Sequence, residues 1–169
     1  MRGLTIAALL VMAFAAPSVA VAESNQTSAY YCTAEVAGGL KYDEVQQKWV
    51  GTSFHNDNQF VVRLNLLRTY VQKEEHLRDE PMKVYEVTIT PRGENHERPC
   101  VSSSGKEVSV VAWANIVGCD AYALDYKINL NLNRYLMTYP VGYAVVAGEH
   151  GEKHAEQPFV EGGICTKIE

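Results

Sequence analysis

Two histidines near the C-terminus are spaced so that they could bind a metal ion. His150 and His154 are four residues apart, so on a helix they would share one face and could bind zinc, nickel or copper. The sequence around them matches neither H-E-x-x-H nor H-x-x-E-H, and Gly148, Gly151 and Pro158 disfavour a helix there. We therefore interpret the segment as a solvated loop, with a weak metal site as the alternative, and expect no metal or other cofactor.

No other part of the sequence has the pattern of a catalytic site. The chain contains no G-x-S-x-G motif, and the sequence SSSG at 102–105 has the composition of a flexible turn. The acidic pairs at 74–75 and 79–80 fall in a charged segment, where solvation explains them better than a glycosidase dyad. We assign no catalytic residue and expect a binding protein rather than an enzyme.

The four cysteines provide a different kind of chemistry. An even number of cysteines without a C-x-x-C pair is typical of structural disulfides in an oxidising compartment. Four cysteines permit three pairings. We prefer Cys100 with Cys119, because that bond closes a local polar loop, and Cys32 with Cys165, because that bond joins the first strand to the last.

The first residues have the composition of a secretory signal peptide. Arg2 precedes an apolar stretch over 4–16, which is shorter than the roughly 20 residues of a membrane-spanning helix, and small residues follow. We predict a signal peptide over 1–22, with cleavage after Ala20 as the alternative, and one β domain over 23–169. No later stretch is long and apolar enough to insert into a membrane, so the sequence predicts a periplasmic or secreted protein.

The charge of the mature chain bears on its partners. Residues 1–22 contain one arginine and no acid, so 23–169 carry 14 Lys and Arg against 20 Asp and Glu. Nucleic acids and anionic membranes are bound through basic patches, and the sequence contains no basic cluster. We therefore expect no nucleic-acid partner, and an envelope or extracellular protein as the partner.

The chemistry would be positioned by strands, and the clearest strand pattern lies within 122–148. Apolar and polar residues alternate over 126–130 and again over 135–139, with a break at 132–134. Alternation with a period of two is what a half-buried strand requires, because successive side chains leave opposite faces of the backbone. This segment therefore predicts a β-hairpin.

Similar patterns predict strands along the rest of the chain, at 30–36, 49–54, 60–64, 83–90 and 159–168, and either one strand or a pair of short ones over 108–117. Residues 91–106 are polar or turn-forming and are expected to be the longest loop. Spacings of three and four predict one short helix near 66–78, with a charged loop as the alternative. The expected fold is all-β, an antiparallel meander of about eight strands that closes into a small barrel, or a sandwich.

Five of the ten tyrosines gather in and around the predicted hairpin. Tyrosine offers a large contact area with a polar tip, so these residues are a candidate binding face. Aromatic residues are also ordinary strand formers, so the alternative is that they close the ends of a β core. The five residues are Tyr122, Tyr126, Tyr135, Tyr139 and Tyr143.

The chain resembles a set of uncharacterised small exported bacterial β proteins. They share Tyr-x-Cys after the signal, a mid-chain pair of cysteines and a closing Gly-x-Cys, which here are Tyr30-Tyr31-Cys32, Cys100 with Cys119, and Gly163-Ile164-Cys165. The chain is also loosely similar to the periplasmic lysozyme-inhibitor barrels, which begin with a Tyr-x-Cys strand. The resemblance implies an exported β domain and no particular activity.

The sequence does not assign a function, and three hypotheses follow from it. The leading one is a non-catalytic exported β-barrel that binds a protein or a cell-envelope component, either as an inhibitor or as a structural protein. The second is a small-ligand carrier with a pocket inside the barrel. The third is a metal-dependent enzyme, for which His150 and His154 would be the ligands.

Overall fold

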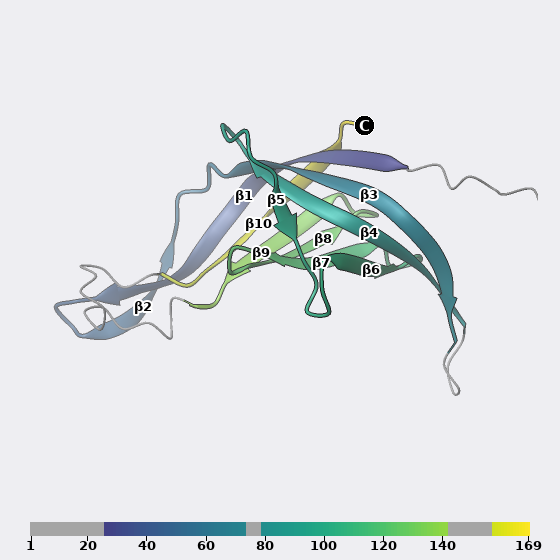
Figure 1. Ribbon diagram of the computed structural model, residues 1–169. Coiled ribbons are helices and arrows are strands. Elements are labelled where there is room, and N and C mark those ends of the chain that lie inside the picture. The colour runs from purple at the N-terminus through teal and green to yellow at the C-terminus, as the bar shows by residue number, and fades with distance from the viewer. Residues whose placement is uncertain (1–25, 74–78, 142–156) are drawn as a thin grey trace, which may run out of the picture.

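A computed structural model describes residues 26–73, 79–141 and 157–169, and almost all of them lie in or between β-strands (Figure 1). No helix in these ranges is long and apolar enough to span a membrane. The expectation of an all-β antiparallel protein is confirmed, with ten strands rather than about eight. The strands are β1 (Thr27–Asp43), β2 (Lys48–Ser53), β3 (Gln59–Gln72), β4 (Glu80–Pro91), β5 (Arg98–Cys100), β6 (Glu107–Val111), β7 (Ile116–Ala121), β8 (Leu124–Asn129), β9 (Arg134–Tyr139) and β10 (Phe159–Lys167).

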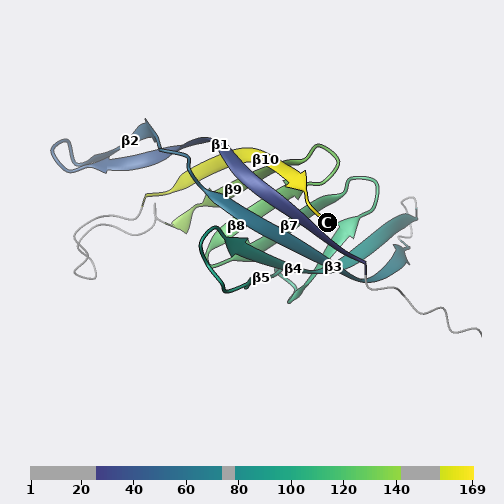
Figure 2. The ribbon, with the colours of Figure 1, turned by 90° about the horizontal axis from the view of Figure 1, so that it is seen from above.

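The strands form one sheet in the order β5-β4-β3-β1-β10-β9-β8-β7, and every pairing is antiparallel. The sheet curves so that β3 and β4 face β7 and β8 across the core (Figures 1 and 2). Its hydrogen-bond ladder does not close. Val101, which follows β5, forms an isolated bridge with Asp120 of β7, in which the two backbones exchange N–H···O hydrogen bonds of 2.9 and 2.7 Å.

The two disulfides hold the first strand to the last and one edge of the sheet to the other. Cys32 and Cys165 lie directly opposite each other on β1 and β10, with Cα atoms 4.0 Å apart. Cys100 on β5 is bonded to Cys119 on β7, one residue from the isolated bridge. This is the pairing preferred from the sequence, and the second bond joins the two edges that the backbone ladder leaves open.

The predicted hairpin is formed by β8 and β9, and asparagines shape its turn. The Asn129 side-chain oxygen accepts hydrogen bonds from the backbone N–H groups of Asn131 and Leu132, both at 3.0 Å. Asn133 has a φ of 54°, a conformation that asparagine tolerates better than most residues. The break in the alternation therefore marks a turn whose geometry depends on its amide side chains.

The prediction of a helix or a charged loop near 66–78 is wrong for the part that the structure describes. Strand β3 continues through Gln72, and residues 74–78 lie outside the described ranges. The pairing of β3 with β4 shifts between Leu66 and Arg68, which makes Leu67 a bulge residue. A bulge inserts one residue into the period of two, so the apolar positions on either side fall at spacings that resemble those of a helix.

The predicted loop over 91–106 also needs a correction, because it contains β5. Arg98, Pro99 and Cys100 pair with β4 along the edge of the sheet. A proline is tolerated there because an edge strand needs hydrogen bonds on one side only. Three residues are too few to display a periodic pattern, so the segment had the composition of a loop.

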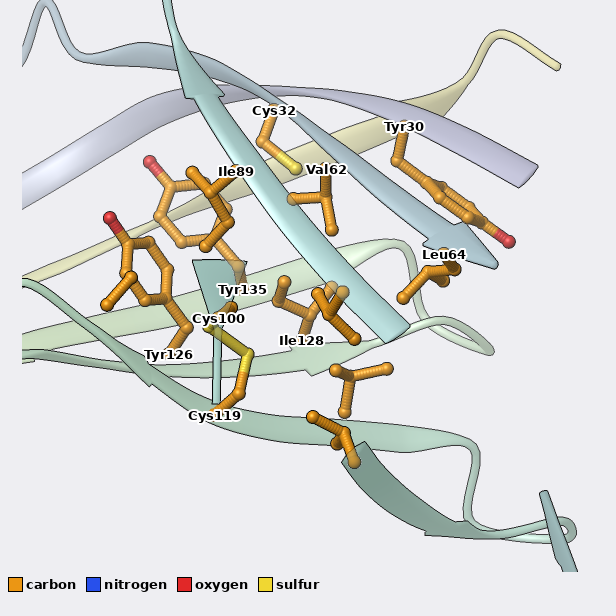
Figure 3. Close-up of a cluster of buried hydrophobic side chains, with 14 of the residues drawn as sticks. Tyr30, Cys32, Val62, Leu64, Ile89, Cys100, Cys119, Tyr126, Ile128 and Tyr135 are labelled. Atoms are coloured by element: carbon orange, nitrogen blue, oxygen red, sulfur yellow. A yellow bond between two sulfur atoms is a disulfide. The ribbon is translucent and has the colours of Figure 1, made fainter. Parts of the chain in front are cut away.

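Side chains fill the space between the two halves of the sheet. The disulfide of Cys100 and Cys119 lies among them (Figure 3). The hydroxyls of Tyr126 and Tyr135 lie at one end of the cluster and that of Tyr30 lies at the other. Dense packing of this kind stabilises the fold and leaves little room inside it. The largest fully buried members are Phe60, Leu64, Ile89, Ile128 and Met137.

The hairpin of β1 and β2 projects beyond the rest of the sheet (Figures 1 and 2). Strand β2 pairs with β1 from Gly38 to Asp43, whereas β10 pairs with β1 only as far as Gly39. The rings of Tyr42 and Trp49 contact each other on this arm at a centroid distance of 5.5 Å. The arm therefore begins where β10 begins, and its base is where the candidate site lies.

Candidate functional site

Glu161 is the one buried charged side chain among the residues that the structure describes, with 5% of its surface exposed. It lies on β10 between Ala37 of β1 and Met137 of β9. Side chains alternate along a strand, so Glu161 faces inward on the same side as the buried Cys165. The fold thus places a carboxylate at one end of an apolar core.

Both hydrogen bonds to this carboxylate are made to the same oxygen. Glu161 Oε1 accepts the Tyr135 hydroxyl at 2.8 Å and the Asn58 amide Nδ2 at 3.1 Å. No Lys, Arg or His of the described segments forms an ion pair with Glu161. No residue of these segments donates a hydrogen bond to Glu161 Oε2. A buried carboxylate without a cationic partner is costly, so Glu161 has unused capacity to bind a positive charge.

A cavity of about 210 Å³ opens beside Glu161 at the base of the β1–β2 arm. Phe54 and Phe159 supply aromatic walls, and Glu161 is the most buried of the lining residues. We call this cavity the acidic pocket. Its lining consists of Ala37, Phe54, His55, Gln157, Phe159 and Glu161.

The close approach of the pocket walls depends on Gly39. A Cβ atom at Gly39 would lie 2.2 Å from the Pro158 carbonyl oxygen and 2.8 Å from Cε2 of Phe54. Backbone hydrogen bonds hold the same junction, since Leu40 donates to Pro158 at 3.0 Å and Phe54 donates to Ala37 at 3.1 Å. The absence of a side chain at Gly39 lets the Phe54 ring and the start of β10 meet against β1.

Two tyrosines of the β8–β9 hairpin, Tyr126 and Tyr135, have their hydroxyls at the same end of the core (Figure 3), and Tyr135 is the one that donates to Glu161. Burial raises the pKa of Tyr135, and the hydrogen bond to Glu161 and the negative charge of Glu161 raise it further. Burial raises the pKa of Tyr126 to about 12, with Arg98 opposing and Glu161 adding to the shift. Both hydroxyls are therefore protonated at neutral pH, and Tyr135 is a permanent donor to Glu161.

The predicted tyrosine face is divided by the structure. Tyr126 and Tyr135 are 5% and 4% exposed and pack edge-on against Phe60, with ring centroids at 5.6 and 4.9 Å. Tyr122 lies in the β7–β8 turn and is 66% exposed, and Cζ of the Arg98 guanidinium lies over its ring at 4.9 Å from the ring centroid. The hairpin thus contributes more to the core than to the surface.

The remaining predicted positions add less to the site. Tyr139 is half-buried, and its ring contacts Phe159 at a centroid distance of 5.9 Å. Tyr143, His150 and His154 lie outside the described ranges. Within those ranges, no three His, Cys, Asp or Glu side chains come together as metal ligands.

Sequence reasoning missed Glu161, although a signal was present. Glu161 stands four residues before Cys165, so on a strand the two side chains share a face. The expected disulfide of Cys165 made that face the inner one. An acidic residue whose side chain leaves the last predicted strand on the same face as Cys165 was therefore a candidate for a buried carboxylate.

We expect Tyr135→Phe to lower the free energy of unfolding by about 1–3 kcal/mol, because it leaves the buried Glu161 carboxylate with one donor fewer. Tyr126→Phe is the matched control, since Tyr126 is buried against the same Phe60 ring but makes no hydrogen bond with a described residue. Its effect should stay within about 0.5 kcal/mol. Urea unfolding of both variants measures the difference, and equal losses would show that the Glu161 bond contributes nothing.

Comparisons of the chain with protein-family models, with curated proteins and with solved structures found no match. The acidic pocket is therefore the feature of the molecule that indicates a function. Its chemistry consists of a buried carboxylate, two phenyl rings and a fixed hydroxyl donor that occupies one of the two carboxylate oxygens.

Proposed function

We propose that the protein is a non-catalytic binding module, exported to the periplasm or secreted, that recognises a protein partner by taking one of its Lys or Arg side chains into the acidic pocket. The observation that carries the proposal is the buried Glu161, whose Oε2 accepts no hydrogen bond from the described residues. A cation brought to this oxygen would offset the desolvation of the carboxylate.

The walls of the acidic pocket suit the rest of such a side chain. Phenyl rings attract cations to their faces and pack against methylene groups, and Phe54 and Phe159 present both kinds of contact. The volume of about 210 Å³ is smaller than the roughly 300–1,000 Å³ of sites for drug-sized ligands. One long side chain is therefore a better match than a free cofactor.

The location of the pocket favours a macromolecular partner. It lies at the base of the projecting β1–β2 arm, where Phe54 follows β2 and contacts the backbone of Ala37. The arm ends in Val45, which is 93% exposed. A partner seated against the arm would bury additional surface around the anchoring side chain, as protein interfaces do around their central residues.

The other inferences from the chain agree with an exported binding protein. Two disulfides are consistent with an oxidising compartment. The interior between the sheet halves is occupied by side chains such as Phe60, Val62 and Ile128, so it offers a carrier function no room at its centre. A role for the protein as an inhibitor or as a structural component of the envelope is compatible with the same pocket.

We expect n-butylammonium and n-butylguanidinium to bind the wild-type protein with dissociation constants in roughly the millimolar range, as befits ligands of a few atoms. Neutral n-butanol should bind at least about tenfold more weakly, because it lacks the charge that Glu161 recognises. NMR chemical-shift titration would measure the affinities and would show whether Phe54, Phe159 and Glu161 respond.

Glu161→Gln should weaken the binding of both cations by about tenfold or more, because it removes the negative charge. The fold should be kept, because the amide oxygen still accepts hydrogen bonds from Tyr135 and Asn58. The matched control is Glu86→Gln, which removes the same charge from an exposed position on β4. Proteins that the wild type retains from envelope extract and Glu161→Gln does not would identify the partner. Equal binding of butanol, or full binding by a folded Glu161→Gln variant, would reject the proposal.

A further inference from the structure

At the other end of the core, a second cavity has the opposite charge. It has a volume of about 170 Å³ and lies between the start of β1, β4, the end of β10 and the residues that follow β6 and β8. We propose that this cavity, which we call the basic pocket, binds a sugar acid, that is, a hydroxylated carboxylate of monosaccharide size. The residues that carry the proposal are Tyr30, Lys83, Tyr85, Asn115 and Lys167, and Leu66 and Leu130 line the same cavity.

Two lysines give the basic pocket its charge. Lys83 comes from β4 and Lys167 from the end of β10, and neither makes a hydrogen bond or ion pair with a described residue. No Asp or Glu lines the cavity. Two ammonium groups without counterions at one cavity form a site for an anion.

Asn115 lines the same cavity, and its side-chain amide oxygen needs a hydrogen-bond donor. This Oδ1 is fully buried and accepts no hydrogen bond from a residue that the structure describes. The orientation of this amide is fixed by its neighbour. Asn131 donates its Nδ2 to the carbonyl oxygens of Trp113 and Ala114 at 3.1 and 3.2 Å, so its Oδ1 must accept from Asn115 Nδ2, at 3.2 Å. Asn115 Oδ1 is therefore a true acceptor, and a simple anion would not satisfy it.

Two tyrosine hydroxyls add to the polar lining, to which Gln26 and Ser28 also belong. Tyr30 and Tyr85 line the cavity, and neither hydroxyl is hydrogen-bonded to a described residue. Burial raises the pKa of both, and the neighbouring Tyr30 raises that of Tyr85 further, so both are protonated donors at neutral pH. The Tyr30 hydroxyl points away from the end of the core where Tyr126 and Tyr135 lie (Figure 3).

The ligand class follows from these groups taken together. The lysines require a negative group, Asn115 Oδ1 requires a hydroxyl or amine donor, and the tyrosines can donate to further oxygens. Leu66 and Leu130 provide an apolar wall for a C–H face. A volume of about 170 Å³ limits the ligand to roughly the size of one sugar ring.

The first test compares three ligands on the wild-type protein. Glucuronate carries both the carboxylate and the hydroxyls, acetate lacks the hydroxyls, and glucose lacks the charge. We expect glucuronate to bind at least about tenfold more tightly than either of the others, measured by NMR titration at low salt. Equal affinity for acetate would show that the site is a non-specific pair of lysines. Equal affinity for glucose would show that the lysines do not contribute to binding.

Variants then assign the groups. Lys83→Met should weaken glucuronate by about fivefold or more, whereas Lys41→Met, which removes an exposed lysine of the β1–β2 arm, should not. Asn115→Gly keeps a residue suited to the φ of 52° and removes the acceptor, so the preference for glucuronate over acetate should shrink by about three- to tenfold. No change in a folded Lys83→Met variant would overturn the proposal. Glu161→Gln should leave glucuronate binding intact, so this site and the proposed function can fail separately.

Discussion

Replacing Gly163 by alanine is expected to lower the free energy of unfolding by about 3 kcal/mol or more. A Cβ atom at Gly163 would lie 2.1 Å from the backbone oxygen of Thr33 and 2.7 Å from Cε1 of Tyr135. The first contact is with the neighbouring strand and the second with the ring that holds Glu161. Neither group can move without disturbing the β1–β10 pairing or the Glu161 carboxylate, so a small local shift cannot relieve the strain.

The adjacent glycine provides the control. A Cβ atom at Gly162 would find its nearest neighbour, the Tyr135 carbonyl oxygen, at 3.6 Å, which is an ordinary contact. Gly162→Ala should therefore be tolerated or slightly stabilising, since glycine is a poor strand former. Urea unfolding of both variants measures the contrast. Equal stabilities for the two variants would mean that β10 is not held against β1 as closely as the structure shows.

Removing the disulfide between Cys32 and Cys165 should cost about 5 kcal/mol, against about 3 kcal/mol for the one between Cys100 and Cys119. In the chain-entropy model the cost grows with the length of chain that the bond encloses, and the sequence separations are 133 and 19 residues. The first bond also joins two strands in the middle of the sheet, whereas the second joins its edges.

The double variants C32A/C165A and C100A/C119A allow this comparison, because alanine leaves no reactive thiol at either site. Their free energies of unfolding should be measured without reductant, in parallel with the wild type. A larger loss for C100A/C119A would indicate that joining the sheet edges matters more than the length of the enclosed chain.

The parts of the fold that could be predicted are those in which local chemistry and tertiary structure agree. The β8–β9 hairpin was predictable because its alternation is regular and its turn is built from asparagine side chains that act within four residues. The presence of two disulfides followed from the even number of cysteines.

The failures have identifiable physical causes. The bulge at Leu67 breaks the period of two, and its effect on the sequence pattern cannot be separated from that of a helical turn. Strand β5 has only three residues and is held by pairing with β4 rather than by its own propensity. Both features are decided by contacts with distant strands, which a local pattern does not record.

The two pockets differ in how far the sequence could have revealed them. Glu161 shares the parity of Cys165, so the inner position of its carboxylate could have been inferred. Asn115 gave no such signal, because its role depends on a left-handed backbone conformation and on Asn131 sixteen residues away. The basic pocket also combines side chains from β1, β4 and β10, and only the strand order brings these together.

The position of β10 has a consequence for the order in which the chain becomes functional during synthesis. Of the strands that the structure describes, β10 is the last in chain order, yet its nine residues lie in the middle of the sheet between β1 and β9. This strand carries Glu161 into one pocket and Lys167 into the other. A chain in which β10 has not yet inserted therefore lacks Glu161 at one pocket and Lys167 at the other, so both proposed sites would be completed in the same step.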